Sequence, residues 1–179
     1  ACISTDHERY LAFIPTAPSE YSSLFDLVVS AASIYGGSWQ EGAGAVFAEN
    51  QALRWLADLA GFPEEAGGVF VSGGTIGNLS ALVVAREDAR RNHPEHKGKW
   101  AILCGDQAHS SIAGAAKIMD VDIVKAARSD DGKIYGDAVE SAIEEYEKTG
   151  GRVFCIVATA GTTNLGIIDH LDSIDDVAV

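Results

Sequence analysis

The last two thirds of the sequence alternate between short runs of β-forming residues and longer amphipathic stretches. From Gly68 onward the successive runs read GVFVS, TIGNLSALVVAREDARR, WAILC, SSIAGAAKIMD, VDIVKA, GDAVESAIEEYEKTG and RVFCIVATAGTT. Strands separated by helix-length segments need crossover connections, and these produce a mainly parallel sheet. The strand runs are continuously apolar, as expected where helices cover both faces of a sheet. We therefore predict an α/β fold.

The first third of the sequence predicts helices rather than strands. Apolar residues recur at helical spacing in residues 21–33 and 45–60, and a glycine-rich connector lies between them at residues 36–42. We predict two regions, an N-terminal helical segment at residues 1–67 and the first part of an α/β domain at residues 68–179.

The sequence ends within a pattern that predicts another helix. The letters LDSIDDVAV begin an amphipathic pattern that has no terminal cap and no following strand. A sheet that stops in the middle of a crossover leaves a strand edge and a helix face uncovered. We therefore expect the 179 residues to be part of a larger protein.

Charge and composition argue against two classes of partner. The chain has 13 Lys and Arg against 26 Asp and Glu, which gives a formal net charge of −13. Such a chain repels phosphate backbones, and its basic residues do not cluster, so we do not expect nucleic acid as a partner. No segment approaches the roughly 20 apolar residues of a membrane-spanning helix, so we do not expect a membrane span.

The cysteines and histidines lack the spacing of a metal site. Cys2, Cys104 and Cys155 are far apart, and the last two lie inside apolar runs, which predicts free thiols buried in strands. The five histidines are scattered, so we expect no metal. No signal-peptide pattern is visible at the start of the sequence. These features predict a reducing compartment, the cytoplasm.

The turn Ser72-Gly73-Gly74-Thr75, between the run GVFVS and a predicted helix, is the first candidate ligand site. Glycines let main-chain N–H groups approach an anion, Thr75 offers a helix cap and a hydroxyl, and the helix start carries partial positive charge. These features suit a phosphate group. The alternative is a tight turn capped by Thr75 without a ligand. Neither a Walker loop nor a complete G-x-G-x-x-G pattern is present, so a nucleotide is not predicted.

Two further candidates also follow predicted strands. His109 can stack on a planar cofactor or transfer protons near neutral pH, or it can be an ordinary hydrogen-bonding residue. Residues 110–111 are interpreted as helix caps. The hydroxyls of residues 162–163 and the Asp169 carboxylate can hydrogen-bond a polar ring. Because the carboxyl ends of parallel strands meet at one edge of a sheet, we expect the three candidates to form one ligand site.

Six stretches of the sequence carry a resemblance to one known family. They are FIPTAP (13–18), GGSW (36–39), ENQALRWLADLAGFP (49–63), VSGGTIGNLSAL (71–82), DQAHSSIAGAAKIM (106–119) and VATAGTTNLGIID (157–169). Together they resemble the group II pyridoxal-phosphate-dependent amino-acid decarboxylases, which include the aromatic-amino-acid and glutamate enzymes. The resemblance covers only the N-terminal portion of the family's chain. It implies a truncated large domain of the aspartate aminotransferase-type fold, preceded by an N-terminal helical segment.

The resemblance also implies a cofactor, pyridoxal 5'-phosphate, and residues that contact it. Six residues match cofactor-binding positions: Gly73, Gly74, Thr75, His109, Thr163 and Asp169. The glycine turn matches the segment that binds the cofactor phosphate. His109 matches a catalytic histidine that stacks on the pyridine ring and helps to orient and protonate the intermediate.

Five residues match segments that line the substrate pocket of the family: Phe13, Ile14, Pro15, Thr16 and Trp39. In this family the pocket is completed across a dimer interface, so the resemblance implies a homodimer. Gly37 stands where enzymes for aromatic substrates often have a bulky residue. An aromatic amino acid is the first expectation for the substrate, and acidic amino acids or diaminobutyrate are the alternatives.

The implied activity is that of a carboxy-lyase in amino-acid metabolism, which converts an L-amino acid to an amine and CO2. The family's Schiff-base lysine, and the aspartate that pairs with the pyridine nitrogen, both follow the matched region. We therefore expect activity only with the missing half, which a second chain could carry. Lys97 comes too early in the sequence to match that lysine and is interpreted as a solvated loop residue. The alternatives are an aldehyde-forming lyase or aminotransferase on the same fold, or a non-catalytic module for cofactor binding or dimerisation.

Overall fold

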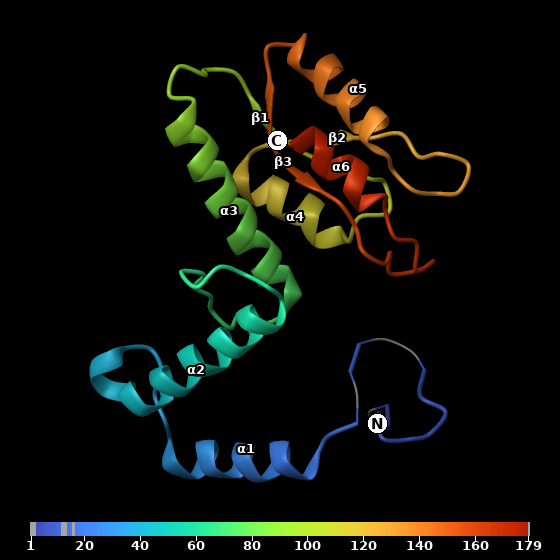
Figure 1. Cartoon of the computed structure of the whole chain (residues 1–179). Coiled ribbons are helices and arrows are strands. Elements are labelled where there is room, and N and C mark those ends of the chain that lie inside the picture. Colours follow the sequence, from blue (N-terminus) through green and yellow to red (C-terminus); the bar gives the residue numbers. More distant parts are fainter. Residues whose placement is uncertain (1–2, 12–13, 16, 179) are drawn as a thin grey trace. The chain divides into compact units, whose positions relative to one another are not determined.

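The structure is a computed structural model that describes residues 3–11, 14–15 and 17–178. The chain forms two compact units, of which the first ends at Phe70 and the second begins at Val71. Figure 1 gives the labels of the helices and strands.

The first unit contains two helices, α1 (Glu20–Ala32) and α2 (Trp39–Leu59), as predicted. Helix α2 begins six residues earlier than predicted, so the second half of the expected glycine-rich connector is helical. The reason is an N-cap at Ser38, whose hydroxyl accepts a hydrogen bond from the Glu41 N–H (3.3 Å) and donates one to the Glu41 carboxylate (2.7 Å). Gly42 interrupts the first turns with non-helical angles (φ −134°, ψ 40°).

The second unit is built on a three-stranded parallel sheet, which confirms the predicted α/β class. Its strands are β1 (Trp100–Cys104), β2 (Asp122–Lys125) and β3 (Arg152–Val157), in the order β2-β1-β3. All five residues of β1 are buried. A central strand buried on both faces is the continuous apolar run that the sequence showed.

Helices cover both faces of this sheet (Figure 1). On one face α3 (Gly74–Asn92) and α4 (Ser110–Met119) pack on a cluster of seven buried residues: Leu82, Ile102, Cys104, Ile112, Ala115, Ala116 and Met119. On the other face α5 (Gly136–Glu147) and α6 (Leu171–Ala178) pack on a second cluster: Leu103, Ala126, Ile134, Val139 and Ile174. Successive residues of β1 point alternately into the two clusters, as the pleat of a strand requires.

A β-bulge interrupts the pairing of β3 with β1. Ala101 lies opposite Val153, but Ile102 lies opposite Cys155, so Phe154 has no partner residue on β1. The extra residue allows Phe154 and Cys155 to pack on the same apolar cluster. The Phe154 ring lies edge-on to Trp100, with ring centroids 6.3 Å apart.

The predicted strand at GVFVS is wrong. Residues 68–72 are not in a strand, and within the described part of the chain no other segment pairs with them. Val69 and Phe70 are more than half exposed. A segment with high strand propensity forms a strand only where a partner strand is present, and the described residues contain no partner for this segment.

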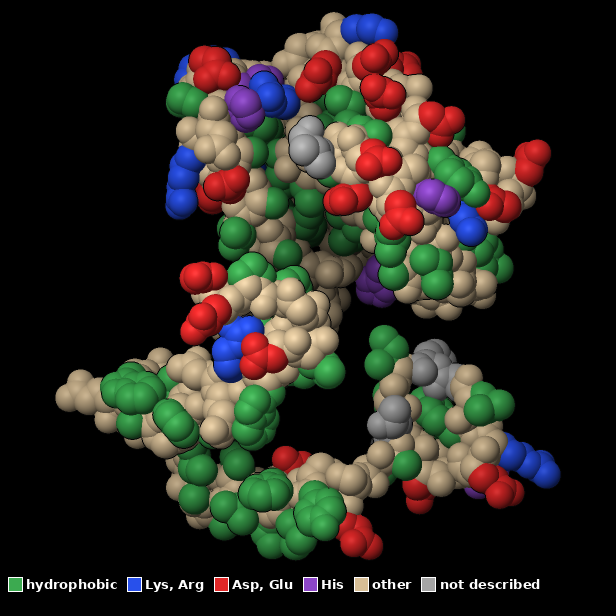
Figure 2. All heavy atoms as spheres, viewed as in Figure 1, with side chains coloured by type: hydrophobic (Ala, Val, Ile, Leu, Met, Phe, Trp, Pro, Cys, Tyr) green, Lys and Arg blue, Asp and Glu red, His purple; other side chains and the backbone are tan. Residues whose placement is uncertain are grey.

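The second unit has an acidic surface, and helix α1 of the first unit exposes large apolar side chains. Figure 2 shows Asp and Glu side chains spread over the second unit, in keeping with the net charge of −13. Six large apolar side chains of α1 are at least half exposed: Tyr21, Leu24, Phe25, Leu27, Val28 and Val29. None of the described helices combines the length and apolar character needed to cross a membrane.

Candidate functional site

The loops that follow β1 and β3 line one open cavity of about 420 Å³ at the carboxyl edge of the sheet. Its lining residues are Asp106, Gln107, Ala108, His109, Ser110, Thr163 and Asn164. Two of the predicted site residues, His109 and Thr163, are therefore brought together from segments more than 50 positions apart. Convergence of loops at this edge is a property of parallel sheets, where strands share one direction.

His109 is the N-cap of α4. The Ser111 N–H donates a hydrogen bond to Nδ1 of the imidazole (3.2 Å), and the His109 side chain thus takes the cap position. The interpretation of Ser110 and Ser111 as caps is wrong, because both are the first residues of the helix. The cap fixes the imidazole by one of its nitrogens, at the point where α4 meets the cavity.

A short hydrogen-bond chain connects His109 to α3. The Asn78 side-chain amide donates to the Ser111 hydroxyl (2.8 Å), and that hydroxyl lies 2.9 Å from His109 Nδ1. At the other end of the helix pair, the Arg86 guanidinium donates to the Met119 carbonyl (3.2 Å). These two contacts hold α3 beside α4, and Asn78 lies about one turn after the start of α3 at Gly74.

The glycine turn leaves the start of α3 open to an anion. Gly73 is the N-cap with φ +89°, and no side chain caps the helix, so the expectation that Thr75 is the cap is wrong. The N–H groups of residues 74–76 have no acceptor within the described part of the chain, since the first bond of the helix runs from Gly77 N to Gly73 O (3.2 Å). Nothing lies within 4 Å of a Cβ built at Gly73 or Gly74. Free amides, open space and a helix start fit a phosphate group.

The loop after β3 places two adjacent threonines in different environments. Thr162 is buried, and its hydroxyl accepts a hydrogen bond from Ile167 N (3.1 Å) while its own N–H donates to the Ile167 carbonyl (2.9 Å). The Gly166 N–H donates to the Thr162 carbonyl (2.8 Å), so this residue closes the loop on itself. Thr163 is exposed and is left to line the cavity.

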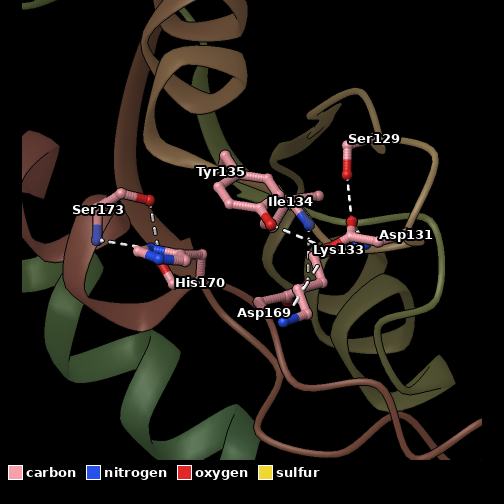
Figure 3. A network of polar contacts seen from close by, with 8 residues as sticks. All are labelled: Ser129, Asp131, Lys133, Ile134, Tyr135, Asp169, His170 and Ser173. Carbon is pink, nitrogen blue, oxygen red and sulfur yellow. Dashed lines mark hydrogen bonds and ion pairs between the residues drawn. The ribbon is translucent and has the colours of Figure 1, made fainter.

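Asp169 is buried, with 7% of its surface exposed, and its carboxylate binds the main chain. One oxygen accepts from Ile134 N (3.1 Å) and the other from Thr159 N (2.8 Å). Figure 3 shows the carboxylate directed towards the segment that contains Ile134. These contacts fix the loop after β3 to the segment between β2 and α5. The predicted contact of Asp169 with the cofactor stays a prediction.

A second network continues from Ile134 to the start of α6 (Figure 3). The Tyr135 ring stacks on His170, with centroids 5.0 Å apart, and the Tyr135 hydroxyl donates to Asp131 (2.9 Å). The hydrogen bond from the Ser129 hydroxyl lowers the pKa of the Asp131 carboxyl, and those from the Lys133 N–H and the Tyr135 hydroxyl add to this effect. The hydrogen bond between Tyr135 and Asp131 raises the pKa of Tyr135. This network supports the residues that hold Asp169.

The loop that carries His109 is also held from β2. The Lys125 ammonium donates to the Gly105 carbonyl (3.0 Å) and to Cys104 Sγ (3.1 Å). Arg128 forms an ion pair with Asp106 (3.2 Å). The Asp106 carboxylate at the cavity is therefore already paired with a cation of the same unit.

The residues predicted to line the substrate pocket belong to the first unit. Ile14 is 93% exposed, Pro15 is exposed and Trp39, the first residue of α2, is 59% exposed, while the predicted Phe13 and Thr16 lie outside the described residues. Their function in a substrate pocket stays a prediction. At Gly37 a Cβ would collide with the Tyr35 ring, so the absence of a side chain there makes room for that aromatic group.

Sequence reasoning missed Asn78 and the hydroxyl of Ser111 as site residues. Asn78 follows Thr75 by three positions and therefore shares its face of the helix, which is the signal that could have identified it. The contact with Ser111 spans 33 positions, and helical spacing within one segment does not predict such a contact.

Comparison with known proteins gives one match over the whole length. A family model described as the pyridoxal-dependent decarboxylase conserved domain matches residues 1–179. The aromatic-L-amino-acid decarboxylase of Bacillus atrophaeus is 34% identical over 175 residues, which cover 96% of this chain and 36% of that protein. The chain spans about a third of the length of the curated relatives it matches.

The solved structures that are similar to this chain include the following two. One is the glutamate decarboxylase domain of the diaminobutyrate-pyruvate transaminase and L-2,4-diaminobutyrate decarboxylase from Vibrio parahaemolyticus, with TM-score 0.86 and 28% identity over 97% of this chain and 41% of that one. The other is Rhodiola rosea 4-hydroxyphenylacetaldehyde synthase, with TM-score 0.81 and 25% identity over 93% of this chain and 38% of that one. These similarities confirm the predicted fold class.

Proposed function

Because this chain belongs to the pyridoxal-dependent decarboxylase family, we propose that it forms part of an enzyme that releases the carboxyl group of an L-amino acid as CO2. The observation that carries the proposal is the cavity where His109 and Thr163 meet, which the Asn78–Ser111 hydrogen bond connects to the first turns of α3, a helix whose open start suits a phosphate. The chain spans about a third of its relatives, so the proposed activity is that of the assembled enzyme, meaning this chain with whatever sequence completes it.

The glycine turn is proposed to bind the phosphate of pyridoxal phosphate. Its three free N–H groups and the positive end of α3 supply attraction without a cationic side chain, which the turn does not contain. When bound, this cofactor withdraws electrons from the substrate, so that the bond to the carboxyl group can break. The protein has to fix the position of that cofactor and deliver one proton to the reacting carbon.

His109 is proposed to deliver the proton that replaces the lost carboxyl group. After the carboxyl group leaves, a proton must be delivered to the same carbon, and an imidazole is the side chain best suited to hold a proton near neutral pH. The N-cap contact and the Ser111 hydroxyl fix the ring at Nδ1, which leaves Nε2 for the reaction. Thr163 is proposed to hydrogen-bond the cofactor from the opposite loop. Asp169 is proposed to hold that loop in place.

An aromatic amino acid is the proposed substrate. The segment at residues 13–18 resembles that of the aromatic-substrate enzymes, and the Bacillus atrophaeus relative is named for that activity. The similarity to a diaminobutyrate decarboxylase and to an aldehyde synthase supports two alternatives, a diamino acid as substrate and an aldehyde as product.

A homodimer is proposed for the assembled enzyme. The apolar side chains of α1 are exposed within their unit, and α1 has no buried residue. A helix that exposes this much apolar surface is typical of an interface. Sedimentation of the assembled enzyme would measure its mass, and substitution of Phe25 and Val28 by Ser should shift it towards the monomer.

A reducing compartment, the cytoplasm, is the proposed location. Cys104 and Cys155 are free thiols in adjacent strands and form no disulfide. Fractionation of cells that produce the protein would test this location.

The activity is tested with the assembled enzyme, pyridoxal phosphate and a panel of amino acids. We expect visible absorbance from bound cofactor, CO2 release from an aromatic amino acid, and an amine as product. An aldehyde with ammonia, formed with consumption of O2 as the oxidant, would favour the aldehyde-forming alternative. Gly73→Ala should weaken cofactor binding because φ +89° strains any residue with a Cβ, whereas Gly114→Ala adds a Cβ into open space on α4 and serves as control. Absence of cofactor binding with every chain present would refute the proposal, as would cofactor binding without release of CO2 from any amino acid.

A further inference from the structure

The hydrogen bonds around His109 determine which of its nitrogens carries the proton. A main-chain N–H can only donate, so the Ser111 N–H at 3.2 Å makes Nδ1 an acceptor. A neutral imidazole whose Nδ1 accepts has its proton on Nε2. No protein group hydrogen-bonds Nε2 within the described part of the chain.

The Asn78–Ser111 pair directs a second donor, the Ser111 hydroxyl, towards His109 Nδ1. The Asn78 amide donates to the Ser111 oxygen (2.8 Å), which leaves the hydroxyl proton of Ser111 free to point at His109 Nδ1 (2.9 Å). Two hydrogen bonds therefore connect α3 through the Ser111 hydroxyl to the imidazole, and the Ser111 N–H adds a third donor to the same nitrogen. Asn78 is placed for this by α3, which the Arg86 contact with Met119 O holds beside α4.

We propose that Asn78 and Ser111 are positioning residues that hold His109 in the Nε2–H tautomer, so that the ring presents a proton rather than a lone pair to the cavity. This inference rests on the proposed function, in which His109 delivers a proton. With the opposite tautomer, Nε2 would accept and could not donate in its neutral form. The contacts also cap α4, so the test has to separate the cap from the tautomer.

Two substitutions make that separation. Ser111→Ala removes the hydroxyl but keeps the main-chain N–H that makes the cap. Asn78→Asp is nearly isosteric and replaces the donor with an acceptor. The Ser111 hydroxyl would then donate its hydrogen bond to the new carboxylate at position 78, and the Ser111 oxygen would be free to accept a hydrogen bond from Nδ1–H. Ser80→Ala is the matched control, since Ser80 lies on α3 and its side chain makes no hydrogen bond to any described residue.

The measurement is the 15N chemical shift of both ring nitrogens of His109 in the 15N-histidine-labelled protein without cofactor, assigned with His109→Gln. We expect a protonated Nε2 and a bare Nδ1 in the parent and in Ser80→Ala. The ratio of Nε2–H to Nδ1–H should fall about fivefold in Ser111→Ala, because one ordinary hydrogen bond that favours Nε2–H is lost. It should fall about 25-fold in Asn78→Asp, because that bond is lost and one that favours Nδ1–H replaces it.

The same variants are then prepared as the assembled enzyme, loaded with cofactor and assayed. Asn78→Asp should lower kcat with little change in KM, whereas Ser80→Ala should leave both unchanged. An Nδ1–H tautomer in the parent, or an unchanged ratio in both variants, would overturn the tautomer proposal. If the ratios change as expected but no amino acid loses CO2, the proposed function fails while the tautomer assignment stands.

Discussion

Removal of the Asp169 carboxylate should destabilise the second unit strongly. Asp169→Ala deprives the Ile134 and Thr159 N–H groups of their acceptor, and Ile134 is fully buried while Thr159 is half-buried. A buried donor left without a partner costs about 1–3 kcal/mol, so the free energy of unfolding should fall by about 2–6 kcal/mol. Asp169→Asn keeps one acceptor oxygen and should lose about half as much.

The loss can be measured by urea unfolding and localised by amide hydrogen exchange. Exchange should accelerate at Ile134 and Thr159 together, because one side chain protects both amides. Asp130→Ala is the control, since Asp130 is exposed and its carboxylate contacts no other described residue by hydrogen bond or ion pair. If Asp169→Ala lies within about 0.5 kcal/mol of this control, the carboxylate does not hold the loop and the reasoning is wrong.

Three further outcomes are expected. Leu103→Ala should cost about 2–5 kcal/mol in urea unfolding, because Leu103 is fully buried in the central strand. Burial, with the hydrogen bond to Asp122, raises the pKa of Tyr146 to about 12. The unfolded chain then loses this proton first, so stability should fall as pH rises from 10 to 12, and Tyr146→Phe should reduce that fall. Burial raises the pKa of the Cys155 thiol, so in a Cys2→Ser background alkylation at pH 8 should be slow until urea is added; fast alkylation of the native protein would contradict this.

The layered α/β architecture could be predicted because strand and helix alternation is a local property of the sequence. The runs WAILC, VDIVKA and RVFCIVA are the three strands, and the amphipathic stretches between them are the helices on both faces. The run GVFVS has the same composition but no strand to pair with among the described residues. Composition reports that a segment suits a strand, whereas pairing decides whether one forms.

The site was predictable in its location and less so in its contacts. The rule that parallel strands end at one edge brings His109 and Thr163 to the same cavity. The use of an imidazole as a helix cap, and the contact of Asn78 with Ser111, depend on how two helices pack and have no sequence period. The distinction between Thr162 and Thr163 likewise follows from the closing of a loop, which the adjacent hydroxyls do not reveal.

The bulge in β3 makes this strand tolerant of a change in length at one position. Deletion of Phe154 would leave Val153 opposite Ala101 and Cys155 opposite Ile102, so pairing and the two faces would be conserved, while the packing of the Phe154 ring on the first cluster and against Trp100 would be lost. The same deletion further along, at Ile156, would place Val157 on the wrong face and pull the following loop away from the cavity. Among homologues, length variation in this strand is therefore expected before Cys155 and not after it.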